Sequence, residues 1–122
     1  MENRKKEKKV EIKTQYNIIL KLLKGLNDNI SQIDNKFSKN KDDVDITNLA
    51  FKVDRIASAL HYSLDFDNKD CIKISENLRE LYRHIRFSMK LIYEQRNFKF
   101  LPSAVNVSKE LYGSWSKIRP TI

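Results

Sequence analysis

Glycine, proline and cysteine are scarce in this sequence. Among 122 residues there are only two glycines, two prolines and one cysteine. Turns need glycine and proline at regular intervals, so this scarcity argues against a turn-rich β fold and favours a few long helices. Because Cys71 is alone, it cannot form an internal disulfide, and we expect a cytoplasmic protein in a reducing compartment.

Long apolar runs are also absent from the sequence. A membrane-spanning helix needs roughly 20 predominantly apolar residues, and no segment comes near that length, so we expect no membrane insertion. The N-terminus is basic, but no apolar segment of the signal-peptide type follows it. We interpret residues 1–9, which carry charges without periodicity, as a disordered basic segment, and residues 10–122 as one helical bundle domain.

Residues that could support catalysis are few. The two histidines, His61 and His84, do not stand at metal-ligand spacing with Cys71 or with carboxylates. Two glycines cannot build a phosphate-binding loop, and no nucleophile has an adjacent base. The sequence therefore predicts no catalytic residues, no metal site and no cofactor, and we expect that the protein is not an enzyme.

Apolar residues recur with the helical period along most of the chain. From Val10 onwards they repeat at spacings of three and four, a strong signal for a bundle helix, and three later segments follow the same rule. The four stripes are Tyr16, Ile19, Leu23, Leu26, Ile30, Ile33 and Phe37; Ile46, Leu49, Val53, Ile56, Leu60 and Leu64; Ile74, Leu78, Leu81, Ile85, Met89 and Ile92; and Ala104, Val107, Leu111, Trp115 and Ile118. They predict an all-α, antiparallel four-helix bundle.

Polar segments separate the four stripes. The predicted connections are Ser38–Asp43, Asp65–Asp70 and Asn97–Pro102. We expect Asp45 or Thr47 to cap the second helix and Asp70 to cap the third, because short polar side chains satisfy the first backbone amides of a helix. Pro102 suits the first turn of the fourth helix. Gly25 lies inside the first stripe, which indicates close contact with another helix.

The formal net charge is +8, with lysines spread along the chain among Asp and Glu. Arg79, Arg83, Arg86 and Lys90 stand at helical spacing and therefore share one face of the third predicted helix. Such a stripe can bind phosphates, but no aromatic residues interleave with it in a stacking pattern. A basic nucleic-acid-binding module and a self-associating structural bundle are accordingly the alternative functions, and nucleic acid is disfavoured as a partner.

Amphipathic aromatic residues are better evidence for a protein partner. The five tyrosines and Trp115 belong to the residue types that are enriched at interface hot spots. Tyr82 follows Leu81, and Tyr112 follows Leu111, at the edges of their stripes. A tyrosine in such a place can complete the core or line a groove. Several such edges on one bundle favour a surface that binds another helix.

Several stretches resemble the flagellin export chaperones, the FliS family. They are Ser63-Leu64-Asp65, Ile74-Ser75-Glu76-Asn77-Leu78, Leu81-Tyr82 and Leu111-Tyr112-Gly113-Ser114-Trp115 with Ile118, and more weakly Leu20, Leu22, Leu23 and Gly25. The chain departs from the family's pattern where Lys24 replaces a usual Asp before the glycine. Its second connection also lacks the family's Gly-Gly, and its charge is more basic.

The resemblance implies a cytoplasmic chaperone that binds the C-terminal helical segment of unassembled flagellin, prevents premature polymerisation and aids delivery to the flagellar type III export apparatus. Export gate components or a co-chaperone would be further partners. The matched motifs imply that the client-binding residues are Asn77, Leu78, Leu81, Tyr82, Tyr112 and Trp115. In the family the N-terminal segment can cover part of the client surface, which implies that role for Tyr16 and Ile12.

Overall fold

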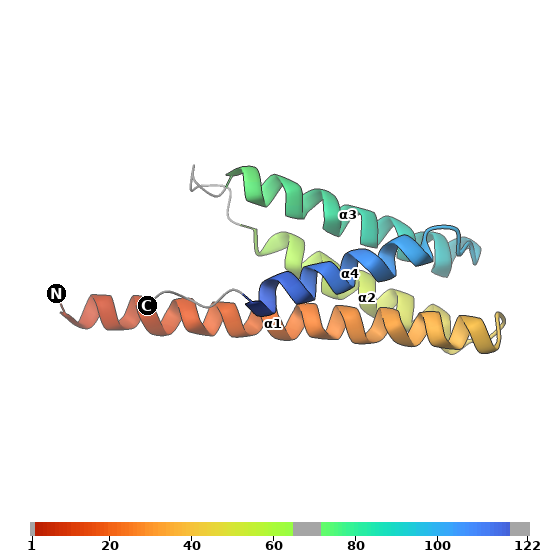
Figure 1. The fold of residues 1–122 in the computed structure, drawn as a ribbon, viewed down its shortest axis with the longest axis horizontal. Helices are drawn as coiled ribbons and strands as arrows, with labels where there is room; N and C mark the ends of the chain where they lie inside the picture. The colour runs from red at the N-terminus through yellow and green to blue at the C-terminus, as the bar shows by residue number, and fades with distance from the viewer. Residues whose placement is uncertain (1, 65–71, 118–122) are drawn as a thin grey trace.

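Four helices make up the described part of the chain (Figure 1). The computed structural model describes residues 2–64 and 72–117, with side chains for residues 16–64 and 76–117. The helices are α1 (Glu2–Lys39), α2 (Asp45–Tyr62), α3 (Ile72–Gln95) and α4 (Leu101–Lys117). No β-strand occurs among these residues, so the predicted all-α fold class is confirmed.

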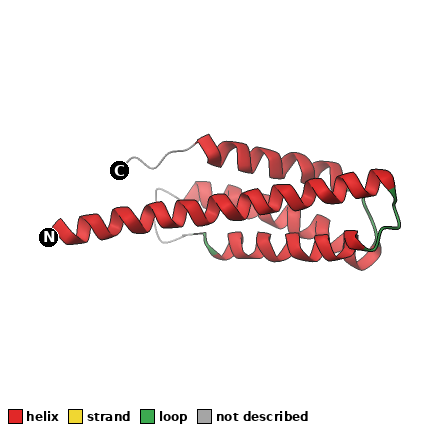
Figure 2. Ribbon diagram, turned by 90° about the horizontal axis from the view of Figure 1, so that it is seen from below, coloured by secondary structure: helices red, strands yellow, loops and turns green. Residues whose placement is uncertain are grey.

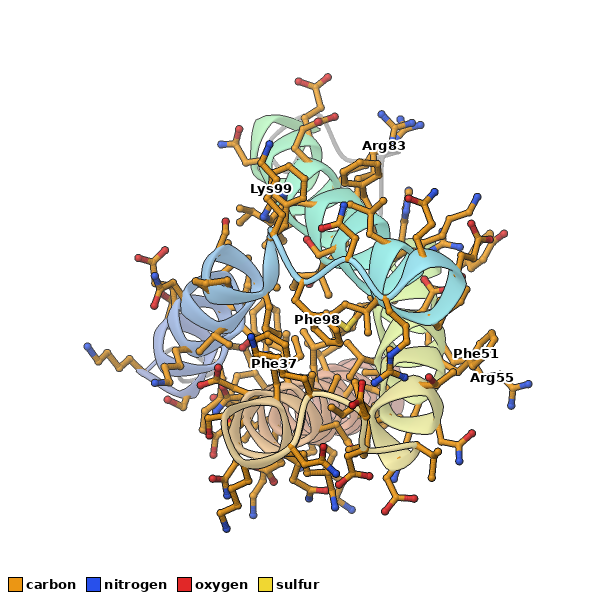
Figure 3. The ribbon with its side chains drawn as sticks, turned by 90° about the vertical axis from the view of Figure 1, so that its right-hand side faces the viewer. Phe37, Phe51, Arg55, Arg83, Phe98 and Lys99 are labelled. Carbon is orange, nitrogen blue, oxygen red and sulfur yellow. The ribbon has the colours of Figure 1, made fainter. Side chains whose placement is uncertain are left out.

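The helices form a ring in which each packs against two others. α1 packs on α2, α2 on α3 and α3 on α4, and α4 returns to α1, while over the described residues the backbones of the diagonal pairs stay apart. Figure 3, viewed along the bundle, shows the four helices around a common interior. Consecutive helices run in opposite directions, which confirms the predicted antiparallel four-helix bundle (Figure 1).

Apolar side chains from all four helices fill this interior. On α2, Ala50, Val53, Ala57 and Leu60 are all fully buried, and the two alanines allow close packing at their positions. The other helices contribute Leu23, Leu26, Ile30 and Ile33 from α1, Tyr82, Ile85, Met89 and Ile92 from α3, and Leu101, Ala104, Val105 and Leu111 from α4. Most of these residues belong to the predicted stripes, so the periodicity identified the buried faces.

α1 begins earlier than the sequence predicted. We expected a disordered segment over residues 1–9 and a helix from Val10, but the backbone is helical from Glu2. The Arg, Lys and Glu residues of this segment are good helix formers, and extending an existing helix requires no new nucleation. The 38-residue α1 therefore projects past the ends of the other helices (Figure 2).

The start of α2 is capped by a different residue from those predicted. Val44 occupies the N-cap position and makes no side-chain cap. The carboxylate of Asp43 instead accepts a hydrogen bond from the backbone amide of Asp45 at 2.9 Å. The prediction of Asp45 or Thr47 as the cap was therefore wrong. Several short polar residues follow one another before α2, and each of them could cap the helix, so the sequence did not distinguish between them.

The sequence also predicted how α3 and α4 begin. Pro102 is the second residue of α4 and lies in its first turn, as predicted. A proline is compatible with this position because the first amides of a helix have no intrahelical acceptor. The predicted cap of α3, Asp70, lies outside the described residues.

One end of the bundle is closed by contacts of the α3–α4 connection with the end of α1 and with the α1–α2 connection. The rings of Phe37 and Phe98 stack there with centroids 4.2 Å apart, and Figure 3 shows both inside the ring of helices. Arg96 ends α3 in the left-handed region, with a φ angle of 50°. Its guanidinium donates hydrogen bonds to the carbonyl of Lys41 and to the hydroxyl of Thr47. Arg96 therefore ties the α3–α4 connection to the α1–α2 connection.

Gly25 lies where α1 faces α2. A methyl group added at Gly25 would lie 3.6 Å from Cδ1 of Ile56, an ordinary van der Waals distance. The expected helix contact at this glycine is therefore present, and it leaves room for one more carbon.

We predict that Gly25→Ala raises the free energy of unfolding by about 0.5–1 kcal/mol, because glycine loses more backbone entropy than alanine in a helix. Urea unfolding followed by circular dichroism measures the change. Gly113→Ala is the matched control, since a methyl group there meets no atom within 4 Å, and it should give a similar gain. Destabilisation by Gly25→Ala alone would mean that α1 and α2 pack more closely than described.

Candidate partner-binding surface

α3 and α4 are the least closely packed pair of adjacent helices in the bundle. Of the four adjacent pairs they make the least extensive contact, and Figure 1 shows them diverging from the connection that joins them. Close to that connection, Nε2 of His84 and Oγ of Ser103 lie 2.7 Å apart at hydrogen-bond distance. This contact fixes which sides of α3 and α4 face each other.

Helical geometry extends the facing sides away from this contact. Leu81 stands three residues before His84, and Val107 stands four residues after Ser103, so both lie on the facing sides. Asn77 lies one further turn along α3. We call the strip formed by these five residues the α3–α4 seam. Leu81 and Val107 are half-buried and pack against the core, so the seam holds two partly covered apolar side chains among three polar ones.

The other side of α4 is held firmly by α1. The rings of Tyr16 and Trp115 stack with centroids 5.7 Å apart and planes 19° from parallel. The hydroxyl of Tyr16 donates to the carbonyl of Trp115 at 3.0 Å, and the indole N–H of Trp115 donates to the carbonyl of Tyr16 at 3.5 Å. Further along, the hydroxyl of Ser108 donates to Oδ1 of Asn27 at 3.2 Å.

The residues implied by the family motifs fall into two groups in the structure. Asn77 is exposed and Leu81 half-buried on the α3 side of the seam, and Leu78 is half-buried as well. Tyr16 and Trp115 contact each other across α1 and α4. Tyr112 stands one turn after Ser108 and is half-buried on the same side of α4. The side chain of Ile12 lies outside the described residues.

Tyr82 has a different environment from the other motif residues. Its side chain is only 3% exposed and forms part of the core. Burial raises the pKa of its phenol to about 12. Tyr82 is therefore a core residue of α3, whereas its neighbour Leu81 is half-buried at the edge of the core.

Sequence reasoning did not single out three members of the seam, Val107, His84 and Ser103. Val107 was assigned to the core stripe of the fourth helix, and the structure places it at the edge of that stripe. The signal available in the sequence was the antiparallel pairing of the third and fourth helices. Counting turns from their short connection would have placed these residues opposite Leu81.

The basic face of α3 points towards α2 and away from the seam. Arg86 donates to Oδ1 of Asp54 on α2 at 2.9 Å, and Arg83 pairs with Glu80 one turn earlier at 3.4 Å. Asp54 also accepts a hydrogen bond from the hydroxyl of Tyr93 at 3.1 Å. The predicted basic stripe is therefore interrupted by carboxylates rather than continuous.

The described residues offer neither a cluster of metal ligands nor a membrane-spanning helix. Over the part of the chain that the structure describes, no cluster of three or more His, Cys, Asp or Glu side chains is placed to hold a metal ion. Within the same residues, no helix combines the length and the apolar character required to cross a bilayer.

The described residues place the protein in the class of small all-α four-helix bundles. Comparison with known families identifies which one. The model of the flagellar protein FliS matches residues 1–122, the whole chain, and the chain therefore belongs to the FliS family. This is a family of chaperones that act in flagellum biogenesis. The comparisons with curated proteins and with solved structures gave no match.

We predict that Tyr16→Phe lowers the free energy of unfolding by about 0.5–1.5 kcal/mol, because it removes the hydroxyl that donates to the Trp115 carbonyl. Urea unfolding measures this change. Tyr62→Phe provides the control, since Tyr62 is 86% exposed and should give a negligible change. Equal effects of the two substitutions would contradict a structural role for the Tyr16–Trp115 pair.

We also predict that Tyr82 makes the protein less stable at high pH. Its folded-state pKa of about 12 lies above the ordinary value of 10.0, because burial disfavours the phenolate. The stabilisation is complete below the unfolded pKa and is lost as the pH rises from about 10 to 12, since the unfolded state ionises first. Urea unfolding at several pH values across this range, with Tyr82→Phe as control, measures how steeply the free energy of unfolding falls with pH. If the Tyr82→Phe variant loses stability with pH as steeply as the wild type, the prediction is contradicted.

Proposed function

We propose that this FliS-family chaperone binds the C-terminal segment of unassembled flagellin in the cytoplasm and thereby prevents premature polymerisation. It would then deliver the flagellin to the flagellar type III export apparatus, where export gate components or a co-chaperone would be further partners. The observation that carries the proposal is the α3–α4 seam. It presents two half-buried apolar side chains, Leu81 and Val107, on a bundle whose family acts in flagellum biogenesis.

The seam has the chemistry that an amphipathic helix requires. A client helix laid along it would cover Leu81 and Val107 with its own apolar face, and removing such surface from water is favourable by about 25 cal/mol per Å². Asn77 is exposed at the open end of the seam. Its amide can form hydrogen bonds to polar groups of the client, which would fix the register of the bound helix.

Tyr16, Tyr112 and Trp115 would form a second contact region on the α1 side of α4. These half-buried aromatic residues present apolar ring surface together with a polar group, as at many protein interfaces. In this proposal Tyr16 and Ile12 mark the part of α1 that can cover client surface. Because Tyr16 already stacks on Trp115, a client reaching this region would bind beside the pair or displace it.

Binding and folding of the client would be coupled. A segment that becomes helical only on the chaperone loses several kcal/mol to ordering, although it buries on the order of 1,000–3,000 Å² of surface. The net affinity is then lower than the buried area alone would suggest. A moderate affinity suits a chaperone, because the client must be released at the export apparatus. No cofactor and no bond chemistry enter this mechanism.

We predict that a peptide comprising the C-terminal segment of flagellin from the same genome binds in a 1:1 complex and gains helical circular dichroism on mixing. Leu81→Asn should weaken binding by roughly tenfold or more, because it removes one apolar side chain from the seam. The tryptophan fluorescence of Trp115 and isothermal titration calorimetry measure the affinity.

Leu49→Asn is the matched control for this experiment. Leu49 is also a half-buried leucine packed against the core, but it lies on α2 beside Gln32 and Lys36 of α1. We expect this variant to lose comparable stability and to keep the client affinity of the wild type. Equal weakening by both substitutions would refute the assignment of the seam, and no binding at micromolar concentration would refute the proposed client.

A further inference from the structure

A second surface feature lies on the opposite flank of α3. The end of α2 and the first half of α3 enclose an open cleft of about 420 Å³, which we call the α2–α3 cleft. Its lining residues are His61, Tyr62, Leu64, Arg79 and Arg86. None of them belongs to the α3–α4 seam, because Arg79 and Arg86 face α2 whereas Leu81 and His84 face α4. The proposed flagellin site therefore does not account for this cleft.

Positive charge is concentrated in the α2–α3 cleft. Two guanidinium groups line it, and a third, that of Arg83, lies near enough to act on His61. Burial lowers the pKa of His61, and the positive charges of Arg79, Arg86 and Arg83 lower it further. Part of the positive charge on Arg86 is offset by Asp54 at 2.9 Å. The remaining field favours an anionic group that can accept hydrogen bonds from guanidinium donors.

Exposed aromatic rings accompany this charge. Tyr62 lines the cleft and is 86% exposed, and Phe87, which lies beside Phe100 of the α3–α4 connection, is 52% exposed. Phe87 also lines the neighbouring hollow, together with Arg86 and Lys90. Large exposed aromatics beside arginines are the composition of protein-binding hot spots rather than of an ordinary solvated face.

We propose that the α2–α3 cleft binds an acidic segment of a second protein, whose carboxylates pair with the arginines and whose apolar side chain packs on Leu64 and Tyr62. Charge complementarity supports this occupant, since the chain carries a net charge of +8 and two arginines, Arg79 and Arg86, line the cleft. Guanidinium groups bind carboxylates in a bidentate geometry that a lysine cannot provide. The cleft is thus a docking site separate from the seam, and both can be occupied together.

A protein segment fits this flank better than a nucleic acid does. A phosphate backbone requires a continuous basic track along which successive charges are neutralised. Here Glu80 pairs with Arg83, Asp54 pairs with Arg86, and Glu94 lies beside Lys90 in the neighbouring hollow. Discrete carboxylates on a short peptide can avoid these negative positions, whereas evenly spaced phosphates cannot.

Titration with a short synthetic peptide of alternating glutamate and leucine tests the proposal on the full chain. We expect binding that weakens with added salt, a rise in the pKa of His61 in NMR titrations, and a loss of roughly tenfold or more in affinity for Arg79→Gln. Arg55→Gln is the matched control, because it removes the same charge from an exposed position outside the cleft. It should change the affinity by less than about twofold.

Two further variants separate binding from folding. Tyr62→Ser alters an 86% exposed side chain, which does not endanger the core, and should weaken peptide binding severalfold. Arg79→Lys should restore part of the affinity that Arg79→Gln loses, because the charge returns without the fork of donors. Circular dichroism confirms the fold of each variant, and the flagellin peptide should bind Arg79→Gln as tightly as the wild type.

The outcomes that overturn the proposal are distinct from those that test the flagellin site. Equal losses for Arg79→Gln and Arg55→Gln would show attraction to net charge alone. Tighter, Arg79-dependent binding of a single-stranded oligonucleotide than of the peptide would replace the protein partner with a nucleic acid. Equal competition by inorganic phosphate would indicate a simple anion site. Absence of peptide binding by the folded wild type would refute the proposal outright.

Discussion

The apolar face of α2 sets the architecture of this protein, because none of its inward side chains can be left in water. Ala50, Val53, Ala57 and Leu60 are covered completely, and α2 makes the most extensive helix contacts in the bundle with α3 and α1. α1, α2 and α3 therefore form a well-packed three-helix unit with α2 in the middle. α4 completes the ring, and it is held mainly from the α1 side, through Tyr16, Trp115 and Ser108.

This unequal distribution of contacts leaves α3 with two flanks of different chemistry. The flank towards α4 carries half-buried Leu81, opposite Val107, between the polar side chains of Asn77 and His84. The flank towards α2 carries arginines, an imidazole and exposed aromatic rings. A helix with two such flanks can take part in two kinds of recognition, one driven by burial of apolar surface and one by charge-assisted hydrogen bonds.

Periodicity predicted the four helices, their order and most of the buried apolar positions. It also predicted Pro102 in the first turn of α4 and the helix contact at Gly25. It did not predict that Tyr16 meets Trp115 or that α3 and α4 diverge. A one-dimensional pattern identifies the face that a helix buries, but the neighbour that covers each edge depends on crossing angles, which the summed packing of all four helices determines. The N-terminal turns of α1 and the Asp43 cap were missed for local reasons, because charged helix formers and adjacent capping residues give ambiguous signals.

The tie made by Arg96 and the stack of Phe37 on Phe98 have a mechanical consequence. The first joins the 96–100 segment to the 40–44 segment and the second joins it to the end of α1, so the start of α4 is anchored at this end of the bundle. The last turns of α4 are anchored as well, because Trp115 stacks on Tyr16 and accepts its hydrogen bond. α4 is therefore held at both ends by contacts that do not involve the facing side of α3. The partial exposure of Leu81 is then a lasting property of the folded bundle and does not require α4 to move.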